Sequence, residues 1–533
     1  MSATPAAIRS RWLAPLEYTF LGVVIFSWAV FVVALGKDMS WDFRNYHWYI
    51  PYAFLHGRMN FDVAVSHQAT YYNPILDIPF YLLARHAPSW FALGALGAVQ
   101  GANIVPLYFL ARTLLRVRHR EIAAGALALF CATGSLTVSL AGQTYYDNIL
   151  SLLILGALAI IVCNREVLRD GPVAHALWTS GVAGLAVGAA IGLKLPEGLY
   201  AFGFAAALAV LPGTFARRLA RLAAGAAGGL AGIGLFAGYW FFKMFHETGN
   251  PLFPYYNQYF RSPLALETSY RDTRFVPHRW PKRLLFPILF SMHWQVANDL
   301  PFHDIRVGGA YVVGILTAPL AFFRRRDSFV DPVVAGALFA FAGVSYAIWI
   351  FAFGIYRYIV ALEMLAPILI VGAIGLWPVG KYFQAVATGM ALAGILLTTH
   401  YEILERAPLG DPYVQVALPP IRDPQHSLIL MTGEAPMGYL LPELPPAIPV
   451  LRIDGWMIQP HDGSKMTAAT RARVDAYKGD LYVIANEYEV GRAGDALAEY
   501  GLGMRWTECN LFTTNLGGPY RFCPLKHLPA KRA

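Results

Sequence analysis

The feature that most constrains this chain is a series of long apolar stretches between residues 18 and 400. A membrane-crossing helix needs about 20 mostly apolar residues. Of 533 residues, 56% are hydrophobic and only 14% are charged, against about 25% charged in soluble chains. The sequence therefore predicts an α-helical polytopic membrane protein and excludes a disordered chain or an ordinary soluble enzyme. We place about eleven crossings, at 18–36, 88–111, 121–140, 148–163, 175–193, 198–212, 222–243, 307–323, 331–353, 357–379 and 382–400.

Basic residues assign the two sides of the membrane. Lysine and arginine in short loops favour the cytoplasm, and every second short loop of this chain is basic. Eleven crossings that start inside place the N-terminus in the cytoplasm and the C-terminus outside. The basic residues of the expected cytoplasmic loops are Arg9, Arg11, Arg112, Arg116, Arg118, Arg120, Arg165, Arg169, Arg217, Arg218, Arg221, Arg324, Arg325, Arg326 and Lys381.

The chain divides into two parts by composition. Residues 1–400 hold the apolar segments and two long outer loops, 37–87 and 244–306. Residues 401–533 are less apolar and predict a small extracytoplasmic α/β domain, with strands at 427–432 and 481–485 and a helix at 468–477. Cys509 and Cys523 lie in this part, where an oxidising compartment lets them pair. Two free thiols in a reducing compartment are the alternative.

Ionisable residues cluster at the outer side. A charged group at the edge of a membrane costs free energy, so such residues are candidates for a functional site. Asp42 lies in an aromatic loop, SWDFRNYHWYIPYAFLHGR, whose positions 42–49 predict an interfacial helix, and Asp38 is its nearest competitor. Asp147 follows in GQTYYDNIL, Lys194 in GLKLPEGLY and Arg357 in GIYRYIV. Four segments that are distant in sequence thus present charged groups to one face.

Each of these residues also has a plainer explanation. Asp147 is compatible with a helix cap and Lys194 with a contact to lipid headgroups, while Arg357 is compatible with a structural pair to Glu363. The long outer loop carries seven further basic residues, which predict phosphate binding or contact with anionic lipids. They are Arg261, Arg271, Arg274, Arg279, Lys282, Arg283 and Arg306.

These motifs together resemble the GT-C superfamily of membrane glycosyltransferases, within it the group that uses polyprenyl-phosphate-linked sugars, such as aminoarabinose transferases and protein O-mannosyltransferases. The resemblance rests on the first-loop aspartate, TYYDN, GLKLPEG, and TGNPLFPYYN with a later RY, and covers about residues 15–400. It implies that Asp42 is the catalytic base, that Asp147 is the second acidic residue, and that Lys194 and Arg357 hold the donor phosphate. Phe43 departs from the family, many members of which have a second acidic residue there.

The resemblance implies transfer of one sugar from a polyprenyl phosphate to a hydroxyl of a lipid, glycan or protein, outside the bacterial inner membrane. A single carboxylate base predicts inversion. Membrane lipids are expected partners and nucleic acid is not. No cofactor is required, although a divalent cation fits two separated aspartates. We expect Arg279, Lys282 and Arg283 to assist at the phosphate, and Tyr46, His47, Trp48, Tyr146 and Glu197 to line the sugar and acceptor pocket.

Two other functions use similar features. A transporter or flippase of a lipid-linked or anionic substrate also needs a charged cavity, but transporters tend to have related halves and charges near the membrane midplane. A lipid-linked oligosaccharide polymerase or ligase handles related glycans with a lipid diphosphate donor. The first-loop aspartate and the charges at one rim favour the transferase.

Overall fold

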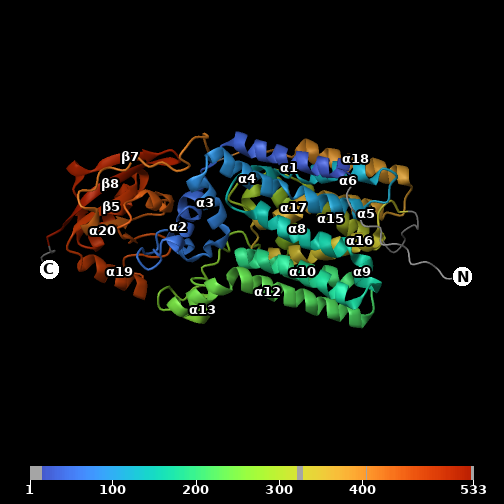
Figure 1. Cartoon of the computed structure of the whole chain (residues 1–533), viewed down its shortest axis with the longest axis horizontal. Coiled ribbons are helices and arrows are strands. Elements are labelled where there is room, and N and C mark those ends of the chain that lie inside the picture. Colours follow the sequence, from blue (N-terminus) through green and yellow to red (C-terminus); the bar gives the residue numbers. More distant parts are fainter. Residues whose placement is uncertain (1–14, 321–327, 404, 530–533) are drawn as a thin grey trace.

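The computed structural model describes residues 15–320, 328–403 and 405–529, which are mostly helical. The long helices lie side by side along the longest axis of the molecule, and the strands gather at one end (Figure 1). These helices are α1 (Pro15–Leu35), α4 (Ser89–Gly101), α5 (Ile104–Leu114), α6 (Arg120–Cys131), α8 (Asp147–Cys163), α10 (Val173–Leu193), α11 (Leu199–Val210), α12 (Phe215–Thr248), α15 (Arg306–Leu320), α16 (Pro332–Ala352), α17 (Val360–Gly375) and α18 (Lys381–Thr398).

Six helical segments of the described residues are long and apolar enough to cross a membrane, which indicates a membrane protein. They are Pro15–Leu35, Ser89–Leu114, Val173–Leu193, Phe215–Thr248, Pro332–Ala352 and Tyr356–Gly375. Three shorter apolar helices are Asp147–Cys163, Leu195–Val210 and Arg306–Leu320. Each expected crossing overlaps a helix, but eleven crossings and the orientation stay predictions. Arg9, Arg11, Arg324, Arg325 and Arg326 lie outside the described residues.

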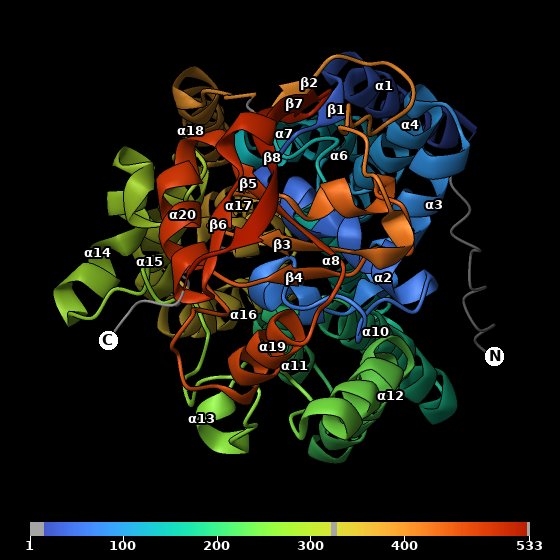
Figure 2. The same cartoon turned by 90° about the vertical axis from the view of Figure 1, so that its left-hand side faces the viewer.

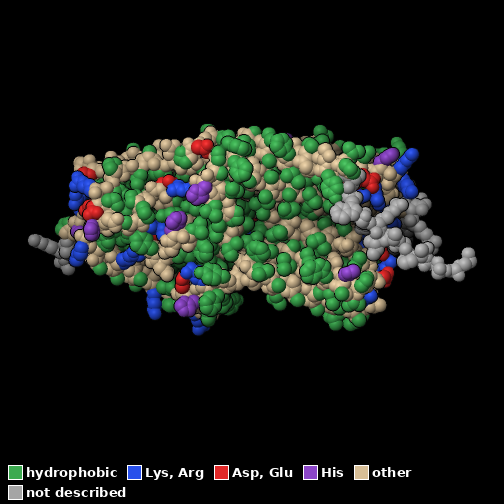
Figure 3. Space-filling model, in the orientation of Figure 1, with side chains coloured by type: hydrophobic (Ala, Val, Ile, Leu, Met, Phe, Trp, Pro, Cys, Tyr) green, Lys and Arg blue, Asp and Glu red, His purple; other side chains and the backbone are tan. Residues whose placement is uncertain are grey.

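The distribution of side chains agrees with a membrane-embedded middle. On the face drawn in Figure 3, hydrophobic side chains cover the helices, whereas Lys, Arg, Asp, Glu and His side chains gather toward the two ends. A lipid-facing surface has this apolar composition because an unpaired charge in hydrocarbon is costly.

Two packing features fix the helices that carry charged residues. The glycines of α10 and α12 face one another so closely that a Cβ on Gly184 or Gly188 would overlap the backbone of Gly225 or Gly229. Small residues allow such approach between apolar helices. Helix α17 lies in the centre, with all 16 residues buried. The segment after α10 and the segment before α17 are therefore each attached to a closely packed helix.

The C-terminal part forms a mixed sheet, with strand order β4-β3-β5-β8-β6 and β7 beside β8. β3 (Ser427–Met431) pairs in parallel with β4 (Val450–Arg452) and β5 (Asp480–Asn486). β8 (Gly517–His527) is antiparallel to β5, β6 (Leu502–Met504) and β7 (Asn510–Thr514). Helices α19 (Lys465–Asp475) and α20 (Val490–Glu499) accompany the sheet. The two expected strands and the expected helix are confirmed; β4 and β6–β8 were not foreseen.

The first outer loop packs against this sheet region (Figure 2, blue beside orange and red). β1 (Lys37–Asp38) pairs with β2 (Arg406–Ala407), and Val63 forms a parallel bridge with Leu451. The expected helix of this loop exists as a π-helical turn, η1 (Phe43–His47), followed by α2 (Tyr49–Leu55). Trp48 and Tyr49 are buried in a core that the loop shares with the C-terminal part, and the interfacial position of this helix stays a prediction.

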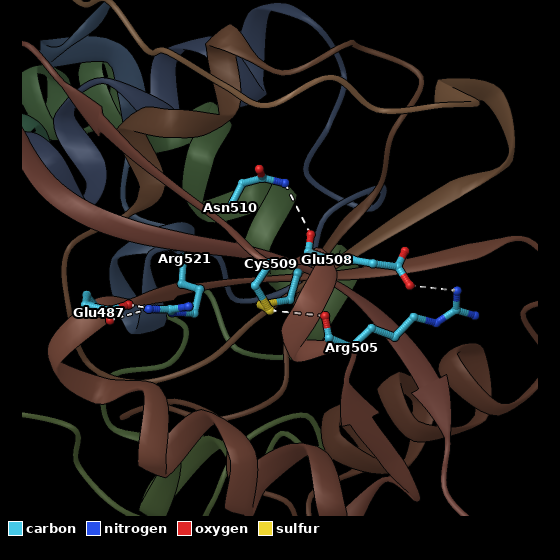
Figure 4. Close-up of a disulfide and its surroundings, with 7 residues drawn as sticks. Glu487, Arg505, Glu508, Cys509, Asn510 and Arg521 are labelled. Carbon is cyan, nitrogen blue, oxygen red and sulfur yellow. Dashed lines mark hydrogen bonds and ion pairs between the residues drawn. A yellow bond between two sulfur atoms is a disulfide. The ribbon is translucent and has the colours of Figure 1, made fainter.

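Cys509 and Cys523 form the expected disulfide (Figure 4). The bond lies between the start of β7 and the last half of β8, near the Arg521–Glu487 ion pair. It ties the two strands where Asn510 pairs with Phe522. The other cysteines, Cys131 and Cys163, are not disulfide-bonded and lie within helices.

Candidate functional site

A cavity of about 590 Å³ lies where the first outer loop, the long outer loop and several helix ends converge. It is lined by residues from 41–47, 68–77, 145–146, 192–196, 251–256, 270–274, 298–300 and 353–358. The segment after α18 contributes Glu405, and the C-terminal sheet region contributes Trp456. The cavity therefore joins both parts of the chain.

Four charged residues singled out in the sequence meet at this cavity: Asp42, Lys194 and Arg357 line it, and Asp147 is buried against the last two. Arg357 Nη1 lies 3.2 Å from Asp42 Oδ2, and Arg357 Nε lies 3.7 Å from Asp147 Oδ2. Lys194 Nζ donates to Asp147 Oδ1 at 2.5 Å and to the carbonyl of Tyr145 at 3.0 Å. Asp147 is buried, while the other three side chains keep 17–20% exposure to the cavity.

Helix ends bring these charges together. Asp147 opens α8 and Lys194 closes α10, so each charge lies near the helix end that favours it electrostatically. Asp42 precedes η1, and Arg357 lies in the single turn η7 (Tyr356–Ile359) that leads into the buried helix α17. The alternative readings of two residues are wrong: Asp147 makes no capping hydrogen bond, and Glu363 accepts hydrogen bonds from Thr137 rather than pairing with Arg357.

Asp42 is oriented and still has accepting capacity. Its Oδ2 accepts from the Tyr46 hydroxyl at 2.9 Å and from Arg357. Burial, with a further contribution from Asp42, raises the pKa of Tyr46 well above its usual value, so this hydroxyl stays a donor. Among the described residues, none donates a hydrogen bond to Asp42 Oδ1. That oxygen is therefore free to accept a proton from a bound molecule.

Asp38, the competitor of Asp42, does not line the cavity. It is fully buried and accepts hydrogen bonds from the backbone and hydroxyl of Thr144 and from the backbone of Ser40. These contacts tie the first outer loop to the turn before α8, which makes Asp38 a structural residue.

A second acid–base pair borders the cavity. His47 Nδ1 lies 2.6 Å from the Oδ1 of Asp77, and both side chains are buried. Burial raises the pKa of Asp77, and the neighbouring His47 opposes that shift. Tyr146 lines the cavity with its backbone in the left-handed region, at φ 61°. His47 and Tyr146 were expected here; Asp77 was missed because it follows an apolar turn with no motif around it.

Of the seven basic residues expected in the long outer loop, two line the cavity, and they are not the three selected for the phosphate site. Arg271, Asp272 and Arg274 line the cavity. Arg274 pairs with Asp272 and Asp299, whereas Arg271 is exposed and forms no ion pair with any residue that the structure describes. Glu405 also borders the cavity, and burial together with Asp38 raises its pKa. Arg271 is one of the seven basic residues that the sequence showed in this loop, but no sequence feature distinguished it from the other six.

Six of the twelve expected site residues lie outside this cavity lining: Asp147, which is buried against Lys194 and Arg357, and five others. Arg279, Lys282 and Arg283 lie at the start of α14 (Trp280–Met292), where Arg283 donates to the carbonyl of Pro277 and covers the ring of Phe351. Trp48 packs against Tyr81 and Tyr413 in the shared core. Glu197 is buried in the turn after Lys194. Helical spacing placed Trp48 beside Asp42 but could not show which side faces the core.

Within the described parts of the chain, no group of three or more His, Cys, Asp or Glu side chains is placed to hold a metal ion. Asp42 and Asp147 are joined instead by the guanidinium of Arg357.

No family model, no curated protein and no solved structure matches this chain.

Proposed function

We propose that this protein is a membrane glycosyltransferase of the GT-C type, which moves one sugar from a polyprenyl phosphate to an acceptor hydroxyl. The transfer takes place outside the cytoplasmic membrane of a bacterium. The proposal includes eleven crossings, a cytoplasmic N-terminus and a periplasmic C-terminal domain. The resemblance of the motifs supports the class of reaction, and the geometry around Asp42 supports the assignment of roles.

One observation carries the proposal: a carboxylate with one free oxygen shares a cavity with several cations. Tyr46 and Arg357 hold Asp42 by Oδ2, and Oδ1 faces no donor of the described chain. Lys194, Arg357 and Arg271 line the same cavity. A hydroxyl is a poor nucleophile at neutral pH and needs a base, whereas a phosphate leaving group needs positive charge. Both requirements are met within one space.

In the proposed reaction the acceptor oxygen attacks the anomeric carbon while the bond from that carbon to the phosphate oxygen breaks. The hydroxyl proton passes to Asp42 Oδ1. The phosphate departs with the bonding electrons, and Lys194, Arg357 and Arg271 stabilise its growing charge. A single displacement of this kind inverts the anomeric centre.

Arg357 has two roles in this scheme. Without donor it neutralises Asp42 and Asp147, whose carboxylates would otherwise repel each other. A bound phosphate would share the guanidinium, since Arg presents several donors in one plane. Asp147 and Lys194 act as a pair that fixes the position of the lysine ammonium.

The test is donor consumption by the purified full-length protein in lipid nanodiscs. A panel of polyprenyl-phosphate sugars is incubated with candidate lipid, glycan and peptide acceptors, and released polyprenyl phosphate is measured. We expect one donor to be consumed with transfer of its sugar and inversion. Exchange of a labelled lipid between leaflets without loss of sugar would instead support the flippase, and consumption of only diphosphate-linked glycans would support the polymerase or ligase.

A further inference from the structure

We propose that the acceptor is a carbohydrate, which binds against the exposed ring of Trp456 in the C-terminal domain, where that ring stacks with Trp41 of the first outer loop. This inference rests on the proposed function and narrows its acceptor from three classes to one. It also gives the C-terminal domain a direct role in substrate binding.

The two indole rings stack on each other beside Asp42, and Trp456 also stacks on the ring of His67. Trp41 and Trp456 both line the cavity, and their ring centroids lie 5.0 Å apart with an interplanar angle of 22°. Trp41 immediately precedes Asp42 in the chain. Trp456 is 47% exposed, although it belongs to a domain whose other large side chains are mostly buried. An exposed indole inside a cavity is available to a ligand.

The turn that carries Trp456 is held rigidly. Its backbone N–H donates to His67 Nδ1 at 3.2 Å, and Gly455 N–H donates to the carbonyl of Ile458 at 2.8 Å. A Cβ on Gly455 would lie 2.6 Å from the ring of His67, so only glycine allows this approach. Asp454 is fixed by Arg492, which donates to both of its carboxylate oxygens. A preorganised ring loses little freedom when a ligand binds.

Polar groups near these rings match the hydroxyls of a sugar. Asn45 and Gln68 line the same cavity, and each has a buried side-chain oxygen without a hydrogen-bond partner among the described residues. Buried polar atoms normally have partners, so these two oxygens lack hydrogen-bond donors that a ligand can supply. A sugar supplies hydroxyl donors at its rim and C–H groups that pack against the electron-rich face of an indole. A simple lipid tail would satisfy the rings but not the amides.

The experiment measures binding of neutral tetrasaccharides, namely chitotetraose, cellotetraose, maltotetraose and mannotetraose. Wild type, Trp456→Ala and Trp506→Ala are compared in nanodiscs by saturation-transfer NMR and calorimetry. Trp506 is the matched control because it is 56% exposed on the same domain and does not line the cavity. Binding of undecaprenyl phosphate and the thermal midpoint are recorded for each protein to verify the donor site and the fold.

We expect at least one tetrasaccharide to bind wild type and Trp506→Ala, with affinity about tenfold weaker in Trp456→Ala and undecaprenyl phosphate binding unchanged. Equal affinity in Trp456→Ala, or no binding of any tetrasaccharide, overturns the inference. Transfer of sugar to a peptide or lipid hydroxyl without glycan binding also overturns it but leaves the proposed function standing. Conversely, glycan binding that depends on Trp456 in a protein that consumes no donor supports this site and refutes the transferase.

Discussion

At the scale of single residues, the charged groups at the cavity are of two kinds. Some position a neighbouring side chain, and others face the cavity. Asp147 is buried against Lys194 and Arg357 and does not line the cavity, whereas Asp42 lines it and has one oxygen directed to neither Tyr46 nor Arg357. In the proposed reaction, this difference favours Asp42 for the proton transfer and Asp147 for the placement of Lys194. Asp42 also differs from Asp38, whose carboxylate accepts hydrogen bonds from Thr144 within the fold.

Replacement of the base should remove chemistry without removing binding. Asp42→Asn keeps the shape of the side chain and can still contact Tyr46, but an amide does not accept a proton at neutral pH. We expect transfer to fall by at least about 10²-fold while polyprenyl-phosphate affinity stays within about twofold. Single-turnover kinetics and donor binding measure the two effects separately. Wild-type turnover in Asp42→Asn would refute its role as the base.

The placement of the basic residues predicts which of them bind phosphate. Arg271→Ala removes a cation that lines the cavity and has no ion-pair partner in the described chain. We expect it to weaken donor binding about tenfold, as a charge-assisted hydrogen bond contributes about 1.5–3 kcal/mol. Arg283→Ala is the matched comparison, because that guanidinium packs on Phe351 outside the lining. Loss of donor affinity in Arg283→Ala but not in Arg271→Ala would restore the assignment made from the sequence.

At the scale of elements, the first outer loop and the C-terminal sheet behave as one unit. Arg58 donates to both oxygens of Asp62 and to the carbonyls of Pro446 and Ile448. Asp62 in turn accepts from the backbone N–H of Val450. The loop that carries Asp42 is therefore positioned by strands nearly 400 residues away in sequence.

Loss of this connection should destabilise the assembly strongly. Arg58→Ala leaves Asp62 buried without its charge partner, and we expect a loss of about 3–5 kcal/mol in the free energy of unfolding of the C-terminal part. Arg473→Ala removes a single hydrogen bond to the carbonyl of Phe61, and about 0.5–1.5 kcal/mol is expected. Pulse proteolysis in denaturant measures both. Similar losses in the two variants would contradict a central role of Arg58.

The contact between His67 and the Trp456 turn predicts a pH dependence. Burial, followed by the nearby Arg452, lowers the pKa of His67 well below the usual value of 6.5. Between these two values the unfolded chain binds a proton that the folded chain does not. The contribution of His67 therefore destabilises the fold as the pH falls below about 6.5, by up to about 1.4 kcal/mol per pH unit.

The measurement is the thermal midpoint at about pH 7 and about pH 5 in wild type and His67→Asn. Asparagine tolerates the positive φ of this position, 54°. We expect the decrease between the two pH values to be smaller in His67→Asn than in wild type. An equal decrease would show that His67 does not control this transition.

At the scale of the whole molecule, an apolar middle separates two charged ends, and the site lies where the helix ends meet the sheet region. The disulfide is compatible with a C-terminal domain in an oxidising compartment. An alkaline phosphatase fusion at the C-terminus should be active in bacterial cells, because that enzyme folds only in the periplasm. A fusion after Asp170, which ends the short helix α9 (Arg165–Asp170), should be inactive. The opposite pattern would invert the proposed orientation.

The sequence by itself determined the apolar helices, because apolar length is a local property. It also located the strands at 427–432 and 481–485, the cysteine pair, and four charged residues that contact one another at one cavity. Only the tertiary structure decided which neighbours line the candidate site. Trp48 and Trp41 lie in the same aromatic segment, yet one is buried against Tyr413 and the other lines the cavity. Local periodicity does not reveal what packs against each face of a helix. Here the C-terminal sheet, from the far end of the chain, packs against the face that carries Trp48.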